Sequence, residues 1–485
     1  MAFVEVVLQF SSGATFPLLN GCHRTGIPAR EIDKALIPLT KELVKVRDLK
    51  ISCDVVVVGG GAVGAFATLD LTLRGVKTAL LERRYVCSGT SGRSHGMLHS
   101  GARYVASDER AARECINENM ILSRIAPHCV RDAGGIFVSV SESDEDYHSI
   151  LLNGCHRAGI PAREMDRDNL AALEPNISPE ARTAILVPDK IVYARELVTT
   201  VLLASIGRGA TVLEEAEVAK IRVERGEVVG VEAYSPGGPI DVSCRAIVNA
   251  AGPWAGRVAA LAGVGVEVVP TAGVMGVAPA NLTRHILNRM RPPSDGDIIV
   301  PYASGASIVG TTAKLVEDPE DIEVTDDDEK ILLEEGSAMV PALKSIGFSR
   351  FYASARPLIM RGGEEWSPRK STRSFEIIDH SADGAAGLFT AAGGKLTTCR
   401  LEAEEASKLV STYIGAPGGS FTGNLPLSEL DQDWIRSARE LLTSGELPHS
   451  LSTLLAEALK TIDAERDSHL LRRILLLQRL RGVSA

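Results

Sequence analysis

The pattern of apolar and polar positions predicts strands that alternate with helices near both ends of the chain. Residues 54–58 form a short apolar run, typical of a parallel strand buried on both faces. Residues 65–74 have helical spacing, Gly75 stands at a C-cap position, and 77–81 form a second apolar run. The same reasoning predicts a helix at 111–129, strands at 135–140, 210–226, 246–251 and 388–392, and a helix at 431–481.

The middle of the chain is richer in strands. Residues 264–277 and 298–311 alternate as antiparallel strands do, and an acidic start opens a helix at 326–341. Strand–helix alternation around a β-rich middle is typical of a nucleotide-binding domain interrupted by a substrate domain. We expect the nucleotide domain at 51–130, 191–262 and 350–415, the substrate domain at 131–190 and 263–349, and a helical tail at 416–485.

One segment occurs twice. Residues 18–33 and 151–166 differ at only two positions. Two copies this far apart are no solenoid, whose repeats recur in tandem. The second copy has a helix that ends at Gly159, then a turn and a second helix start at Asp166 or Asp168, whereas the first has no such context. We interpret residues 1–50 as an upstream extension with a duplicated fragment, dispensable for activity; the alternative is a genuine N-terminal subdomain.

Composition and charge exclude several classes of protein. Apolar residues make up 45% of the chain and charged residues 24%, and the net charge of -10 gives no electrostatic footprint for nucleic acid. No uncharged apolar run reaches the ~18 residues of a membrane helix, and no secretory signal opens the chain. The eight cysteines are scattered without a CxxC pair, which argues against a metal site and favours reduced cytosolic thiols.

The strongest motif is a G-x-G-x-x-G that directly follows the first predicted strand. Gly59 permits a tight turn, Gly61 lets the backbone approach a pyrophosphate, and Gly64 allows the helix to pack on the sheet. The positive end of the helix that starts near Ala62 would hold the diphosphate. Glu82 ends the second strand 18 residues after Gly64, where an acid bonds the ribose hydroxyls.

Three further segments favour a tightly held FAD over NAD. The polar run 88–93 can supply backbone and hydroxyl donors, and 247–254 is a strand that enters a glycine turn. Residues 391–398 start a helix whose positive end would stabilise the negative charge that develops on reduced flavin. Besides the five residues above, we expect FAD to contact Val63, Arg83, Thr90, Ser91, Ser94, His95, Val218, Ala251, Gly252, Gly394, Leu396 and Thr397.

These expectations define one fold class. It is α/β, with a Rossmann-like FAD-binding domain of the glutathione-reductase or D-amino-acid-oxidase type. A β-rich substrate domain is interleaved with it, and a short helical tail closes the chain.

Several motifs are more specific than a shared FAD fold. They are S-G-R-S-H-G-M-L-H-S-G-A-R-Y at 91–104, A-R-E-C-I-N-E-N at 112–119, P-S-D-G-D-I-I-V-P at 293–301, G-T-T at 310–312 and R-P-L at 356–358. Through them the chain resembles the FAD-dependent glycerol-3-phosphate dehydrogenases, most closely the large catalytic subunit of the anaerobic enzyme. The resemblance implies oxidation of sn-glycerol 3-phosphate to dihydroxyacetone phosphate. It also implies that hydride passes from C2 to flavin N5 and that a partner subunit or quinone accepts the electrons.

The resemblance also implies a substrate site. In this family, residues that match Arg103, Tyr104, Arg356, Arg373 and Lys395 surround the substrate, and we expect Arg356 and Lys395 to act in catalysis as well. Any one arginine alone would be read as a solvated surface charge. Four basic residues at one site suit a phosphate monoester, which carries close to two negative charges.

Two histidines lie in the segment expected near the flavin ring. Hydride transfer from C2 requires a group that takes the hydroxyl proton, and histidine suits this role near neutral pH. We favour His99 as the general base. The alternative, for either His95 or His99, is a packed histidine that orients the loop.

The sequence departs from the family at a few positions. Cys399 stands where the family has tyrosine, Lys190 and Tyr193 replace small and acidic residues, and no cysteine-rich tail follows. Two alternatives therefore stay open: a flavin enzyme for another small 2-hydroxy acid or amine, which predicts a single carboxylate-binding arginine, or a non-catalytic scaffold protein. We expect a cytoplasmic protein without a transmembrane segment, or one held at the inner membrane face through a partner.

Overall fold

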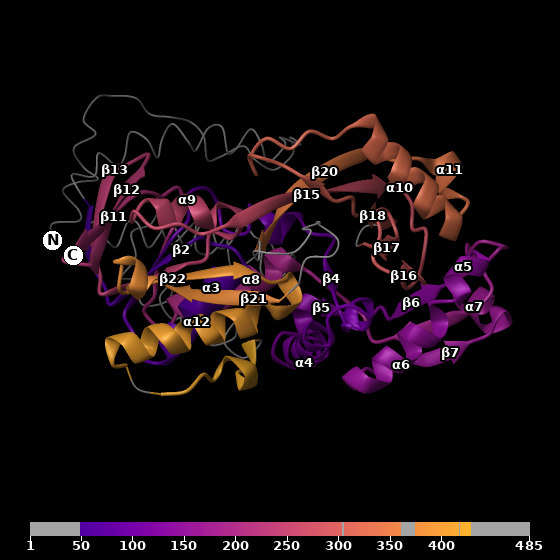
Figure 1. Cartoon of the computed structure of the whole chain (residues 1–485), viewed down its shortest axis with the longest axis horizontal. Helices are drawn as coiled ribbons and strands as arrows, with labels where there is room; N and C mark the ends of the chain where they lie inside the picture. Colours follow the sequence, from indigo (N-terminus) through magenta and orange to yellow (C-terminus); the bar gives the residue numbers. More distant parts are fainter. Residues whose placement is uncertain (1–48, 303–304, 360–373, 417, 428–485) are drawn as a thin grey trace, which may run out of the picture.

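The computed structural model describes residues 49–302, 305–359, 374–416 and 418–427. Within these ranges the chain forms an elongated molecule with two lobes, and the long strands β15 (Val268–Ala278) and β20 (Arg350–Ile359) run between them (Figure 1). Three expectations lie outside the described residues. They concern the first copy of the repeat, the helix at 431–481 and Arg373.

The first lobe is built on a six-stranded sheet in the order β10-β3-β2-β14-β22-β21. All neighbouring strands are parallel except β21, which pairs antiparallel with β22 at the edge. The strands predicted at 54–58, 77–81, 246–251 and 388–392 all form here, with bounds that differ from the prediction by one or two residues. The six strands are β2 (Val55–Val58), β3 (Thr78–Leu81), β10 (Thr211–Leu213), β14 (Ala246–Asn249), β21 (Phe375–Asp379) and β22 (Leu388–Gly393).

Layers on both faces explain why these strands are continuously apolar. Helices α3 (Ala62–Leu73), α8 (Ala194–Ile206) and α12 (Cys399–Ile414) pack on one face, where Val55 and Val57 are fully buried. Val56 and Val58 point to the opposite face and pack against a four-stranded sheet and α9 (Ala255–Ala260). The four-stranded sheet consists of β1 (Leu49–Ser52), β13 (Gly238–Ser243), β12 (Glu227–Ser235) and β11 (Glu217–Glu224).

The second lobe is built on a nine-stranded sheet, in which β20 pairs with β15 beside the order β19-β15-β18-β17-β16-β6-β8-β7. One face carries α7 (Arg167–Leu173), α10 (Asp326–Met339) and α11 (Leu343–Ile346). The remaining strands are β6 (Gly135–Val138), β7 (Arg163–Met165), β8 (Ala184–Val187), β16 (Ile286–Arg289), β17 (Ile298–Pro301), β18 (Ser307–Gly310) and β19 (Lys314–Leu315).

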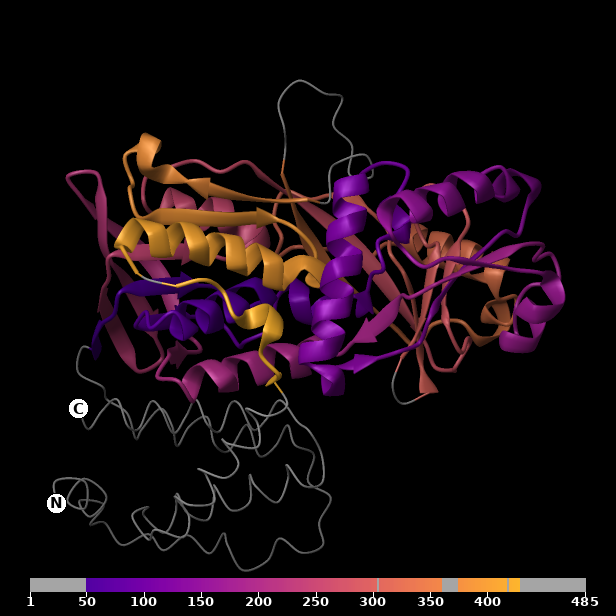
Figure 2. The same ribbon diagram turned by 90° about the horizontal axis from the view of Figure 1, so that it is seen from below.

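Helix α4 (Glu109–Ile125) lies between the two lobes, as both views show (Figures 1 and 2). The Asp108 side chain caps it by accepting the Ala111 N–H at 2.9 Å. Close by, β4 (Met97–Leu98), β9 (Lys190–Val192) and β5 (Val130–Arg131) form a small sheet.

The second copy of the repeat forms α6 (His148–Ala158), β7 and the start of α7, with α5 (Glu142–Glu145) just before it. Gly159 adopts the left-handed conformation at the end of α6, and the Asp166 side chain caps α7, as the sequence predicts. The segment between the two helices is a strand, β7, rather than the simple turn that the sequence predicts. It pairs antiparallel with β8, a partner that the local pattern does not reveal.

The structure divides the chain differently from the sequence at residues 350–359. The sequence pattern assigns this segment to the nucleotide domain, but β20 pairs antiparallel with β15 over its whole length and so belongs to the nine-stranded sheet. Hydrogen bonds also join β20 to the other lobe. Thr90 Oγ1 donates to the Ala355 carbonyl at 2.6 Å, and Ser354 Oγ donates to the Arg93 carbonyl at 3.3 Å. Because β20 serves both lobes, a domain boundary based on local pattern misplaces it.

The described cysteines are all buried and form no disulfide with one another. In the same part of the chain, no helix combines the length and apolar character needed to cross a membrane.

Replacing Gly64 with alanine should destabilise the fold. A Cβ at this position would lie 1.9 Å from the Gly59 carbonyl oxygen, so α3 or the preceding turn must move. We expect the free energy of unfolding to fall by about 3 kcal/mol, because backbone cannot yield as a flexible side chain can. The matched control is Gly265→Ala, where no atom lies within 4 Å of the added Cβ. Equal denaturation midpoints for the two variants would contradict this account.

Candidate active site

A cavity of about 1110 Å³ collects residues from both lobes. It exceeds the ~300–1,000 Å³ of ordinary ligand pockets, so it has room for a dinucleotide and a small substrate together. Most of the predicted site residues line it, although their roles stay predictions. They are Gly59, Gly61, Ala62, Val63, Glu82, Arg83, Thr90, Ser91, Ser94, His95, His99, Arg103, Tyr104, Val218, Ala251, Gly252, Arg356, Gly394, Lys395 and Leu396.

Two predicted residues lie behind the cavity wall. Gly64 packs against the carbonyl of Gly59, and Thr397 is completely buried. Thr397 Oγ1 accepts the backbone N–H of His99 at 3.0 Å. Thr397 therefore positions the His99 loop, and Gly64 positions α3.

The turn after β2 is tightly organised. Gly59 has a φ of 109° and lies so close to Ala250 that a Cβ would meet its carbonyl oxygen at 2.6 Å. Glu82 accepts the Gly60 N–H at 2.7 Å and the Arg84 N–H at 2.8 Å. This carboxylate thus stays at the end of β3, facing the cavity, and fixes the turn that precedes α3.

Gly61 faces open space. A dinucleotide can bind here only if the backbone at Gly61 is left uncovered by other side chains. Its added Cβ would contact only one non-neighbouring atom within 4 Å, Ser91 Oγ at 3.2 Å. Ser91 Oγ in turn accepts the Ala62 N–H at 3.0 Å. The start of α3 thus offers its positive end and a bare backbone to the cavity, the arrangement that accommodates a diphosphate.

Sequence reasoning missed a cluster at one side of the cavity. The Arg83 guanidinium lies 4.8 Å from the centroid of the Trp254 ring, and both residues line the cavity. Glu320, from the loop before α10, pairs with Arg83 and with Arg84, the latter at 2.9 Å. Trp254 belongs to a segment that the sequence singles out, but nothing local pairs Arg83 with Glu320, 237 residues away.

Arg103, Arg356 and Lys395 are three of the basic residues that line the cavity. Arg103 is buried, and its Nη2 forms an ion pair with Asp297 Oδ1 at 2.5 Å, while its Nη1 has no hydrogen-bond partner among the described residues. Arg356, on β20, donates through Nη2 to Thr311 Oγ1 and to the Thr312 carbonyl at 3.1 Å. The Lys395 ammonium lies 4.9 Å from the centroid of the Tyr104 ring.

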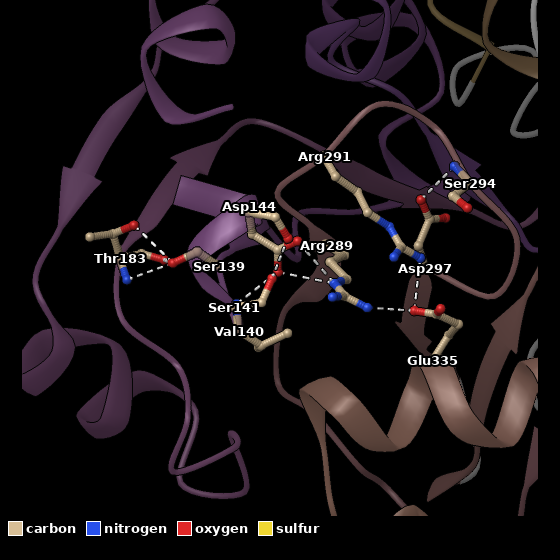
Figure 3. A network of polar contacts seen from close by, with 11 residues as sticks. Ser139, Val140, Ser141, Asp144, Thr183, Arg289, Arg291, Ser294, Asp297 and Glu335 are labelled. Carbon is tan, nitrogen blue, oxygen red and sulfur yellow. Dashed lines mark hydrogen bonds and ion pairs between the residues drawn. The ribbon is translucent and has the colours of Figure 1, made fainter. Parts of the chain in front are cut away.

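A polar network in the second lobe supports the Arg103–Asp297 pair. Asp297 Oδ2 accepts the Ser294 N–H at 2.8 Å (Figure 3). This leaves Oδ1 to accept from Arg103. In the same region Arg289 and Arg291 each bond Glu335 on α10 at 2.7 Å. Asp144 on α5 also accepts from Arg289 (Figure 3). The loop that carries Asp297 is thus tied to two helices, and this limits the positions that Arg103 can take.

The two histidines differ in what they can do. Burial, together with the charges of Arg356 and Arg103, lowers the pKa of His95 to about 3. Its Nδ1 accepts the Met97 N–H at 3.1 Å, so the neutral ring keeps its proton on Nε2. The His99 ring stacks edge-on against His95 at 5.7 Å and lies 5.5 Å from Tyr104. His95 is therefore a hydrogen-bond donor near neutral pH and a poor proton acceptor.

Behind the His99 loop lies a buried carboxylate that sequence reasoning missed. Asp189 Oδ1 accepts the Ser100 N–H at 2.6 Å, and Asn288 Nδ2 lies 3.5 Å from Oδ2. Burial raises the pKa of Asp189 to about 6, which these hydrogen bonds and the charge of Arg103 only partly offset. The signal for Asp189 in the sequence is the Val-Pro-Asp segment that it ends. The residues that stand out there are Lys190 and Tyr193, because they depart from the family pattern.

The departures from the family pattern fall in two places. Cys399 is buried at the start of α12 and lines the cavity. Lys190 points elsewhere, since its ammonium bonds Ser123 Oγ on α4 at 2.9 Å, and Tyr193 stacks against Tyr302 with ring centroids 6.3 Å apart. Neither Lys190 nor Tyr193 lines the cavity, which leaves Cys399 as the departure that bears on it.

Comparison with solved structures indicates the same fold. A glycerol-3-phosphate dehydrogenase from Bacillus halodurans, complexed with FAD, matches with a TM-score of 0.62 and 22% identity over 87% of this chain and 81% of that one. Glycine oxidase from Geobacillus kaustophilus also gives a TM-score of 0.62, at 22% identity, over 76% of this chain and 96% of the other. At these identities the likeness supports the predicted α/β fold alone.

Comparison of sequences finds relatives with higher identity to this chain. The profile of the family described as FAD dependent oxidoreductase matches residues 54–400. The A1 chain of the anaerobic glycerol-3-phosphate dehydrogenase of Haloferax volcanii is 38% identical over 392 residues, 78% of this chain and 67% of the relative. Its counterpart in the anaerobic enzyme of Escherichia coli is 36% identical over 389 residues, 79% of this chain and 71% of the relative. The chain belongs to the FAD-dependent oxidoreductases, in the family of the anaerobic glycerol-3-phosphate dehydrogenases.

Proposed function

We propose that this FAD-dependent enzyme oxidises sn-glycerol 3-phosphate to dihydroxyacetone phosphate. The observation that carries the proposal is the convergence of Arg103, Arg356 and Lys395 on the cavity that also holds the glycine turn. Asp297 offsets the charge of Arg103 but leaves its Nη1 without a partner among the described residues, so a buried guanidinium donor remains for the substrate. A phosphate dianion matches several such donors, whereas a hydroxy acid needs one forked arginine.

Different residues would contact the two ends of the substrate. We infer that Arg103, Arg356 and Lys395 bind the phosphate, because forked, charge-assisted bonds orient it as well as attract it. With the phosphate fixed, C2 and its hydroxyl must lie farther along the cavity, next to His95 and His99, which line it too. Positioning of this kind supplies much of the rate gain in bimolecular reactions.

Proton removal falls to His99 in this proposal. His95 has a pKa of about 3 and its Nδ1 already accepts the Met97 N–H, so it can donate to the substrate but not take its proton near neutral pH. His99 lies beside it, on a loop held by Thr397, which accepts the His99 N–H, and by Asp189, which accepts the Ser100 N–H. Bound FAD supplies the hydride acceptor, N5, for the hydrogen on C2.

The reaction requires a further electron acceptor. We propose a partner subunit or a quinone, because the relatives are named as subunits of a multi-subunit enzyme. The described part of the chain holds no group of three or more His, Cys, Asp or Glu residues suited to a metal centre.

An anaerobic titration tests the proposed reaction. Adding sn-glycerol 3-phosphate to the yellow holoenzyme should bleach the flavin absorption, whereas lactate, other small hydroxy acids and amino acids should not. Bleaching by a hydroxy acid alone would favour the alternative enzyme, and no bleaching by any of them would favour a scaffold protein. A quinone analogue should restore the spectrum faster than oxygen does, and rapid oxygen uptake with stoichiometric hydrogen peroxide would make the protein an oxidase instead.

Gly61→Val should remove FAD without unfolding the protein. The Cβ of the new side chain would meet one non-neighbouring atom of the described residues within 4 Å, Ser91 Oγ, and the valine methyl groups would fill the space expected for the diphosphate. We expect purified protein without yellow colour whose circular dichroism and apo-state stability match those of deflavinated wild type. A normal flavin content in this variant would mean that the cofactor lies elsewhere.

Arg356→Ala should weaken the enzyme through its substrate. Loss of a charged donor from a buried phosphate site costs on the order of 2–5 kcal/mol in kcat/KM, and Arg356→Lys should recover only part because it loses the fork. Arg350→Ala is the matched control, since Arg350 is exposed at the start of the same strand, β20. Wild-type kcat/KM in Arg356→Ala would remove Arg356 from the site.

A further inference from the structure

A buried acid lines the cavity beside the residues predicted to hold the flavin. Glu402 lies on α12, one turn after Cys399, and only 2% of its surface is exposed. It approaches the Gly393-Gly394 turn so closely that a Cβ on Gly394 would lie 2.1 Å from Glu402 Oε2. A Cβ at position 394 would therefore require the Glu402 carboxyl group to shift, and both residues face the same cavity.

One oxygen of the carboxyl group lacks the partners that a buried anion requires. Glu402 Oε2 is buried and has no hydrogen-bond partner among the described residues. An unpaired carboxylate in such a place carries a desolvation cost that far exceeds the stabilisation available near a helix start. Burial raises the pKa of Glu402 well above its usual range, and the opposing charge of Lys395 does not cancel that effect. The uncharged acid is the form that this environment favours.

The ionisable groups around α12 are engaged elsewhere. On α3, Asp70 pairs with Arg74 at 2.7 Å, and on α4, Glu118 pairs with Arg400 at 2.5 Å. Cys399 lines the cavity next to Glu402, and burial raises the pKa of its thiol. The strands β14 and β22 carry no ionisable side chain, whereas β21, which also packs on α12, carries Glu376 and Asp379. Within the described residues, Lys395 is the charge that acts on Glu402.

We propose that Glu402 is a further cofactor-contacting residue, whose uncharged carboxyl group donates a hydrogen bond to an acceptor atom of the bound isoalloxazine beside Gly394. This inference rests on the proposed binding of FAD in the cavity, but not on the identity of the substrate. A neutral acid kept protonated by an apolar site is a strong donor to a group on which negative charge develops. Glu402 then stabilises the reduced cofactor more than the oxidised one, and so raises the reduction potential.

The test compares the flavin midpoint potentials of purified holoenzymes, measured by reductive titration against reference dyes. Glu402→Gln keeps a donor of the same shape and should behave as wild type near neutral pH. Glu402→Leu removes the donor and should lower the equilibrium constant for flavin reduction roughly tenfold, about 30 mV for a two-electron couple. As pH rises and Glu402 ionises, the wild-type potential should fall below that of Glu402→Gln. Glu405→Gln, an exposed carboxylate on the same helix, serves as the control and should match wild type throughout.

Two results would overturn the proposal. A higher potential in Glu402→Gln than in wild type at neutral pH would show that Glu402 is an anion there, and an unchanged potential in Glu402→Leu would show that it does not contact the cofactor. If Glu402→Leu loses flavin, the comparison of wild type with Glu402→Gln across pH decides alone. The measurement uses no substrate. A negative result for Glu402 therefore does not contradict the proposed oxidation, and the role of Glu402 can be tested even in a holoenzyme that does not oxidise glycerol 3-phosphate.

Discussion

The close approach of α3 to the turn after β2 determines where every other part of the site lies. The Gly64 Cα hydrogen faces the Gly59 carbonyl at a distance that no Cβ could occupy, and Gly59 itself abuts Ala250 at the end of β14. These contacts bring the start of a helix and the ends of two parallel strands to one edge of the sheet. Ligands of open α/β sheets bind at such an edge, and here the edge forms one wall of the cavity.

The opposite wall belongs to the second lobe, and the two are joined by buried charge. Arg103 comes from the segment before α4, whereas Asp297 lies 194 residues later in the chain. Breaking such a buried pair by removal of one partner is strongly destabilising, so the pair also fixes how the lobes meet. The network around Arg289 and Glu335 holds the Asp297 loop in turn (Figure 3). The same interactions that position the lobes thus set the charge available to a substrate.

Much of this arrangement could be predicted from the sequence because its signals are local. The apolar run of β2, the glycines and Glu82 lie within one strand–helix–strand unit, and the basic positions lie in compact motifs. The contributions of Asp297 and Asp189 could not be predicted, because each depends on a partner far away in the chain. That of Glu402 could not be predicted because it depends on an oxygen that has no hydrogen-bond partner within the described residues. The prediction that assigned β20 to the nucleotide domain was wrong because its pairing with β15 is likewise long-range.

The central claim is that this cavity directs the hydrogen on C2 of glycerol 3-phosphate to FAD. The most direct measurement is the rate of flavin bleaching in a single anaerobic turnover, with substrate carrying deuterium at C2 compared with substrate carrying it at C1. We predict that deuterium at C2 slows bleaching by a primary isotope effect and that deuterium at C1 leaves the rate unchanged. Bleaching with no isotope effect from C2, or with one from C1, would contradict the account.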